Sequence, residues 1–294
     1  MNNRYISIII LLAVSFILYF YDNIISDFIL VVVLVAGLDL SSDLVFDQMV
    51  ESPGSDYNYS FLLLGFITSL DEILVAAGSV FSGFPQIGSG ALLGSSVLII
   101  ILYSMIVAIS RSTFHFMHPY YFLIFPFILV LELISYNYSL NATPVYALSI
   151  IVSLVVVWKV IRGWQIIPGK SEGGRMTGFI FLIPLVIFAL LLSIGTERIS
   201  SAVKISQFMS GFLIPGVLGT IPEMIMIYGT FRRNIHNAGE GLLTGSTIMK
   251  GTLLFPIVQV LFYADTRADT PLIIFSAVVS VFFACVLFFK EFRP

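Results

Sequence analysis

The long apolar runs of this chain constrain its fold more than any other feature. A helix needs about 20 mostly apolar residues to cross roughly 30 Å of hydrocarbon. A membrane β-barrel needs alternating strands of about ten residues instead, and these unbroken runs do not fit that pattern. The sequence therefore predicts an all-α integral membrane protein. We expect ten membrane-spanning helices, at about 5–22, 27–48, 59–82, 88–110, 118–136, 143–162, 177–200, 207–230, 240–263 and 270–290.

The composition excludes several classes of protein. Of the 294 residues, 58% are apolar and 11% are charged, and the mean hydropathy is +1.03. Soluble domains are about one quarter charged, and disordered chains combine low hydrophobicity with high net charge. The net charge is -3 and the basic residues are scattered, so we expect no nucleic-acid partner. The one cysteine, Cys285, excludes an internal disulfide, and we expect no cofactor.

The distribution of Lys and Arg predicts the orientation in the membrane. With ten spans both termini lie on one side, and ten of the 14 Lys and Arg residues fall in the loops of that side. Three fall on the other side, and Lys250 lies within a span. Because positive charge marks the cytoplasmic side, we expect both termini in the cytoplasm of a prokaryotic cell, with the protein in its plasma membrane. The first run follows Arg4 and lacks a small-residue cleavage site, so we expect it to be retained as a helix.

The chain repeats itself at an offset of 151 residues without a gap. Gly65–Glu72 (GFITSLDE) matches Gly216–Glu223 (GVLGTIPE), and Gly90–Val97 (GALLGSSV) matches Gly241–Ile248 (GLLTGSTI). The spacing from glutamate to the first serine of the second motif is 23 residues in both copies (95 − 72 and 246 − 223). Apolar helices resemble one another by chance, but Gly, Glu and Gly-Ser at one offset indicate a true repeat.

The repeat predicts the domain organisation. We expect residues 1–140 and 141–294 to be two repeats of five transmembrane helices each. Because five is odd, the second repeat enters the membrane from the opposite side. Inverted repeats of this kind place a substrate site near the bilayer midplane and allow two packings that open alternately to either side.

The centre of each repeat carries a glutamate deep in the membrane. Glu72 and Glu223 lie near the middle of their spans, where a charge costs roughly 2.5–3.5 kcal/mol on insertion scales. Ser95 and Ser246 follow in the next spans, on faces of small residues that let helices approach closely. Carboxylate and hydroxyl oxygens suit hard cations such as Ca²⁺. The alternative is a structural ion pair or a protonated, hydrogen-bonded glutamate.

These motifs resemble those of the Ca²⁺/cation antiporter superfamily, which includes the sodium/calcium exchangers. The resemblance is specific at about 65–99 and 216–250 and architectural elsewhere. It implies a sodium/calcium exchanger-like core of ten helices in a 5+5 inverted repeat, with two central glutamates as cation ligands. The positions that carry over by this resemblance are Thr68, Ser69, Glu72 and Ser95 in the first copy, and Thr220, Glu223 and Ser246 in the second.

The sequence also departs from the family pattern. Asp71 stands where the first copy has a proline, and Ile99 and Lys250 stand where the two copies often have an amide or a carboxylate. We expect Asp71 and Lys250 to modulate the ion site. Lys250 is either a structural counter-ion to the glutamates or a tethered substitute for Na⁺. In the second case it could release a proton when Ca²⁺ enters, since burial disfavours a charged lysine, and the coupling ion would be H⁺.

The leading functional hypothesis is therefore a secondary-active antiporter, and not an enzyme, that exchanges Ca²⁺ against Na⁺ or H⁺ by alternating access. Its partners would be inorganic cations and the lipid bilayer. The sequence predicts no particular oligomeric state. A passive cation channel is one alternative. An intramembrane aspartyl protease is a weaker one, suggested by Tyr21-Asp22 and Gly37-Leu38-Asp39.

Overall fold

The computed structural model is helical wherever it describes regular structure. It describes residues 3–21, 23–49, 69–109, 120–137, 143–163, 172–232, 243, 245–262 and 269–291. The helices are α1 (Asn3–Tyr19), α2 (Ile24–Met49), α4 (Leu70–Phe81), α5 (Pro85–Ile109), α6 (Tyr120–Asn137), α7 (Thr143–Gly163), α8 (Glu172–Val203), α9 (Gln207–Gly211), η1 (Phe212–Leu218), α10 (Gly219–Arg232), η2 (Ile248–Leu254), α12 (Phe255–Phe262) and α13 (Thr270–Glu291). All ten predicted runs contain helix, apart from stretches such as 59–68 that lie outside the described residues. The all-α prediction is confirmed.

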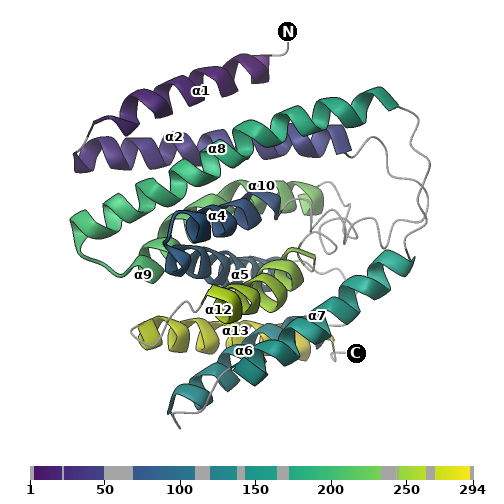
Figure 1. The fold of residues 1–294 in the computed structure, drawn as a ribbon. Helices are drawn as coiled ribbons and strands as arrows, with labels where there is room; N and C mark the ends of the chain where they lie inside the picture. Colours follow the sequence, from purple (N-terminus) through teal and green to yellow (C-terminus); the bar gives the residue numbers. More distant parts are fainter. Residues whose placement is uncertain are drawn as a thin grey trace.

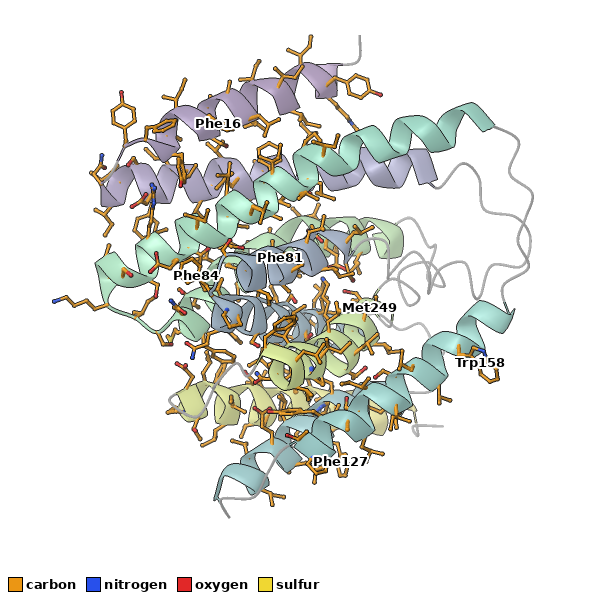
Figure 2. All side chains as sticks on the ribbon, in the orientation of Figure 1. Phe16, Phe81, Phe84, Phe127, Trp158 and Met249 are labelled. Atoms are coloured by element: carbon orange, nitrogen blue, oxygen red, sulfur yellow. The ribbon has the colours of Figure 1, made fainter. Side chains whose placement is uncertain are left out.

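The helices have the length and surface of membrane-spanning segments. By length and composition, five stretches of the described chain could cross a bilayer: Ile24–Ser41, Pro85–Leu102, Ile183–Val203, Gln207–Ile225 and Gly245–Phe262. Shorter apolar stretches lie in α1, α6, α7 and α13. Large apolar side chains cover the outside, such as Phe16 on α1 and Phe127 on α6, which are 54% and 59% exposed (Figure 2). A surface of this kind belongs in lipid, and the protein is an integral membrane protein.

The helices form three tiers (Figure 1). In the first, α1 packs on α2, and α2 packs along α8. In the second, α4 and α5 pack together and α5 also contacts α9, η1 and α10. In the third, α13 packs against α6, and α7 packs against η2 and α12. The two segments that carry the glutamates therefore lie in the middle tier, between the other helices.

In the α2–α8 pair, each helix has a glycine that packs against side chains of the other helix. Gly37 of α2 lies against the ring of Phe188, where a Cβ would meet the ring at 2.5 Å. Gly195 of α8 lies against Leu30 and Val31 of α2. The two helices are therefore antiparallel, and one separation of 158 residues (195 − 37 and 188 − 30) relates both glycines and both partners. This pairing fits helices that are related by inversion.

Glycines bring α5 into backbone contact with the second copy. A Cβ on Gly90 would collide with the carbonyl of Phe208, and one on Gly94 with the carbonyl of Phe212. From the other side, Gly211 lies against the carbonyl of Ile87. The prediction that Gly90 and Gly94 form a face for close helix packing is confirmed. These contacts hold α5 against α9 and η1, just before the helix that carries Glu223.

A tight turn joins α4 to α5. The N–H of Phe84 donates to the carbonyl of Ser79 at 2.7 Å and that of Gly83 to Val80 at 3.1 Å. Gly83 has φ +85°, the left-handed conformation that glycine allows at a helix C-terminus. Pro85 then begins α5, where its missing N–H costs nothing. The turn sets α4 and α5 side by side, so that α5 packs against α4, the helix that carries Glu72.

The described part of the second copy departs from regular α-helical geometry. The chain stays helical but widens into the π-helical segments η1 and η2. Pro215 lies inside η1 and Pro256 follows η2. A proline removes one backbone donor and crowds the preceding turn, and a wider turn relieves this crowding. Short π-helical segments occur frequently at functional sites.

Candidate cation site

A lysine bridges the two predicted glutamates. Lys250 Nζ lies 2.6 Å from Glu72 Oε1 and 2.5 Å from Glu223 Oε2. The lysine is 0% exposed, and the glutamates are 3% and 7% exposed. Charge-assisted hydrogen bonds of this kind are shorter and roughly twice as strong as neutral ones. The three side chains form one buried ion-pair cluster.

The three side chains of the cluster come from three different helical segments. Glu72 lies in the first turn of α4, Glu223 lies in α10, and Lys250 lies in η2. The N-terminal turn of a helix favours negative charge because its backbone N–H groups point outward, and Asp71 and Glu72 occupy that turn. Residues that are 178 positions apart, Glu72 and Lys250, thus meet at a site that both copies build.

The charges of the cluster do not cancel. Two carboxylates and one ammonium leave one negative charge. Asp71 lies beside Glu72 and within electrostatic range of Lys250, so ionised Asp71 would raise the excess to two. Removing one partner of a buried pair typically costs about 3–5 kcal/mol, because it leaves the other charge uncompensated. A positive charge between the glutamates therefore stabilises the cluster.

Hydroxyl groups from both copies surround the ion pairs. The Ser69 hydroxyl donates to that of Ser246 at 3.2 Å, and Ser246 is a hydrogen-bond partner of Glu223. The Thr220 hydroxyl donates to the carbonyl of Gly216 at 2.5 Å and lies 3.5 Å from Glu72 Oε1. Its single proton goes to the nearer acceptor, so it binds Glu72 weakly at most. Three predicted hydroxyl residues therefore lie at the centre.

Of the two other predicted residues, the structure describes only Ser95. Ser95 is buried, but its hydroxyl donates to the carbonyl of Leu92 in its own helix at 3.2 Å. Serine side chains in helices often bond in this way to the preceding turn. Thr68 lies outside the described residues. Ile99, at the position that corresponds to Lys250 in the first copy, packs in the hydrophobic core around α5.

The cluster holds oxygens that a cation could use. In the described part of the chain, Glu72 Oε2 and Asp71 Oδ1 are buried and receive no hydrogen bond. Buried acceptors are nearly always satisfied by a partner, water or ion. Among the same residues, no three His, Cys, Asp or Glu side chains are grouped as a metal site.

Sequence reasoning missed two residues that bind the backbone close to Lys250. Ser149 and Ser153 of α7 donate hydrogen bonds to Thr252, two residues after the lysine. None of the three belongs to a repeated motif. The signal that could have identified them is Pro256, which cannot donate to the carbonyl four residues earlier, that of Thr252.

Comparison with known proteins adds one finding. The structure is similar to the crystal structure of the H⁺/Ca²⁺ exchanger CAX, with a TM-score of 0.68 over 98% of this chain and 84% of that chain. The chain has the exchanger fold. The sequences are 14% identical, so the likeness establishes the fold alone, and it fits the expected 5+5 arrangement. No protein-family model matches the sequence, and no curated protein matches it significantly.

Proposed function

We propose that this protein is a secondary-active cation antiporter that exchanges Ca²⁺ against Na⁺ or H⁺ by alternating access. The observation that carries the proposal is the convergence of Glu72 and Glu223, from the two copies of the repeat, on one buried positive charge. A position where two carboxylates hold an ammonium away from water is electrostatically a cation site. The exchanger fold gives independent support.

The groups around this position have the chemistry of a Ca²⁺ site. Hard cations take carboxylate, hydroxyl and carbonyl oxygens. We propose Glu72 and Glu223 as the charged ligands, with hydroxyl or nearby backbone oxygens from Thr68, Ser69, Ser95, Thr220 and Ser246. Asp71 lies beside Glu72 and would modulate the ion site. Among the described residues of the site, Asp71 Oδ1 and Glu72 Oε2 are buried acceptors without a hydrogen-bond partner.

In this proposal Lys250 occupies the position of the transported ion when the site is empty. An incoming cation must displace the ammonium from Glu72 and Glu223, because the same carboxylate oxygens would bind both. The lysine thereby keeps the empty carrier from burying two uncompensated carboxylates. It also competes with the substrate, so it sets the apparent affinity for the cation.

The proposed transport cycle uses the two repeats. Residues 1–140 and 141–294 would exchange their packings so that the central site opens to each side in turn. Both termini would lie in the cytoplasm, as the distribution of Lys and Arg predicts, in the plasma membrane of a prokaryotic cell.

The test is ⁴⁵Ca²⁺ uptake into proteoliposomes under an imposed Na⁺ or H⁺ gradient. Ca²⁺ uptake should depend on one of the two gradients. The ion of that gradient should leave the proteoliposomes as Ca²⁺ enters. Glu72→Gln and Glu223→Gln should each lower the initial rate by about 100-fold or more, because each removes a charged ligand from a buried site. Glu197→Gln is the matched control, since its carboxylate accepts from Ser201 at the exposed end of α8.

Other results would point elsewhere. Ca²⁺ current without any counter-ion gradient would indicate a passive channel. Full uptake by both Gln variants would contradict the assignment of the site. The protease alternative receives no support from the comparisons, because the similar structure is that of an exchanger. Of its candidate aspartates, Asp22 lies outside the described residues and Asp39 lies within α2.

A further inference from the structure

Two serines of α7 bind the backbone next to Lys250. The hydroxyls of Ser149 and Ser153 donate to the carbonyl of Thr252 at 2.5 Å and 2.9 Å. Ser153 also lies 2.8 Å from the Thr252 hydroxyl, which itself donates to the carbonyl of Ile248 at 2.7 Å. All of these groups are buried. We call Ser149, Ser153 and Thr252 the α7 clasp.

The clasp supplies donors to a carbonyl that has no α-helical partner. Thr252 lies in the π-helical segment η2, and the residue four positions later is Pro256, which has no N–H. A buried carbonyl is stabilised when other donors reach it. The two serine hydroxyls reach it from a neighbouring helix.

The residue between Lys250 and Thr252 is also closely packed. A Cβ on Gly251 would meet the Phe125 ring of α6 at 2.5 Å and the Ser96 hydroxyl of α5 at 2.9 Å. The segment that contains Lys250 is therefore fixed on α5, α6 and α7, while the lysine side chain reaches Glu72 and Glu223. A shift of one residue between π-helical and α-helical register would turn a side chain by roughly 100° about the helix axis.

We propose that Ser149 and Ser153 are positioning residues for Lys250. By holding the carbonyl of Thr252, they keep η2 in the register that places the ammonium between Glu72 and Glu223. They thereby set how easily a cation displaces it. This inference rests on the proposed function, because it assigns the clasp a role in cation affinity and not only in stability.

The consequence is a change in affinity with a defined sign. If the clasp is weakened, Lys250 is held less firmly and competes less well with the incoming cation. The variant Ser149→Ala/Ser153→Ala should therefore bind Ca²⁺ more tightly, with Kd lowered about 2- to 5-fold. This change is a fraction of the roughly 1.4 kcal/mol that corresponds to a factor of ten. Lys250→Met removes the competitor completely and should lower Kd about 10-fold or more.

The deciding experiment is a mutant cycle on the purified full-length protein, measured by equilibrium ⁴⁵Ca²⁺ binding. In the Lys250→Met background the serine substitutions should leave Kd unchanged, because they act through the lysine. The same 2- to 5-fold change in both backgrounds would overturn the proposal, as would an unchanged Kd in the serine variant. Ser276→Ala is the matched control, since in the described part of the chain the hydroxyl of this buried α13 serine donates to Leu272 of its own helix. This variant should bind Ca²⁺ as the wild type does.

A second readout does not depend on Ca²⁺. In cation-free detergent solution, the serine substitutions should lower the thermal unfolding midpoint less in the Lys250→Met background than in the wild type, and equal losses would also overturn the proposal. If the double variant does not fold, the single variants Ser149→Ala and Ser153→Ala enter the same cycles with about half the effect. Absence of Ca²⁺ binding in every form would contradict the proposed function, while the unfolding cycle would still test the positioning of Lys250.

Discussion

The two copies of the repeated motif have similar sequences and different local structures. In the first copy, the described parts of the motif lie in the regular α-helices α4 and α5. In the second copy, the segment that corresponds to α5 contains the π-helical turn η2 around Lys250. This difference lies next to a proline. The second copy has Pro256, where an offset of 151 places Met105 in the first.

This comparison shows how a symmetric scaffold carries an asymmetric site. Each copy contributes one glutamate, but only the second contributes the cation, because Lys250 corresponds to the buried Ile99. Pro256 cannot donate to the carbonyl of Thr252, and the α7 clasp binds that carbonyl instead. The second copy therefore positions the charge that balances both glutamates.

The largest expected effect tests this division directly. Lys250→Met should lower the free energy of unfolding in cation-free solution by about 3–5 kcal/mol, because it leaves Glu72 and Glu223 buried without a counter-charge. Millimolar Ca²⁺ should restore much of the loss by binding between them. The measurement is thermal unfolding of the detergent-solubilised protein with and without Ca²⁺.

The matched control lies at the same position in the other copy. Ile99→Met changes a buried side chain to one of similar volume and should cost less than about 1.5 kcal/mol, with no dependence on Ca²⁺. Equal losses in the two variants would mean that the copies do not differ in the way described, and that Lys250 serves only as packing.

Much of this arrangement could be predicted from the sequence. The apolar runs predict the helices, because their length reports the span of a bilayer, and the repeat predicts that Glu72 and Glu223 belong to one site. The departure at Lys250 identifies the residue that joins them. These features are visible because they depend on residue type at a fixed offset, which a sequence shows directly.

The remaining features depend on packing that no offset encodes. The hydroxyl of Ser95 turns to its own helix, and Ser149 and Ser153 reach Thr252 from about 100 positions away. The sequence contains the prolines of the second copy, but whether a proline unwinds, kinks or widens a helix is decided by the neighbouring helices. The widening into η1 and η2 therefore could not be predicted from the sequence.

The next effect concerns the junction between the copies. Gly94→Ala should destabilise the protein by about 1–3 kcal/mol, because its Cβ would collide with the backbone of Phe212, which cannot move aside cheaply. Gly219→Ala, at a helical position with nothing within 4 Å, should be neutral or stabilising by up to about 1 kcal/mol. Thermal unfolding measures both variants. If Gly94→Ala melts no lower than Gly219→Ala, the close contact between α5 and η1 is incorrect.

The smallest expected effect compares the two glycines of the α2–α8 pair. At Gly37 a new Cβ would meet the ring of Phe188 at 2.5 Å, whereas at Gly195 it would approach Val31 Cγ2 at 3.3 Å. Because a side chain can adjust more readily than backbone, Gly37→Ala should cost about 1–2 kcal/mol, less than the upper range for Gly94→Ala. Gly195→Ala should change stability by no more than about 0.5 kcal/mol, since the gain in helix propensity offsets the tighter contact. Thermal unfolding in detergent resolves the order of the two variants. A larger loss of stability in Gly195→Ala than in Gly37→Ala would contradict this packing. It would mean that the tighter contact of the α2–α8 pair is at Gly195 and not at Gly37.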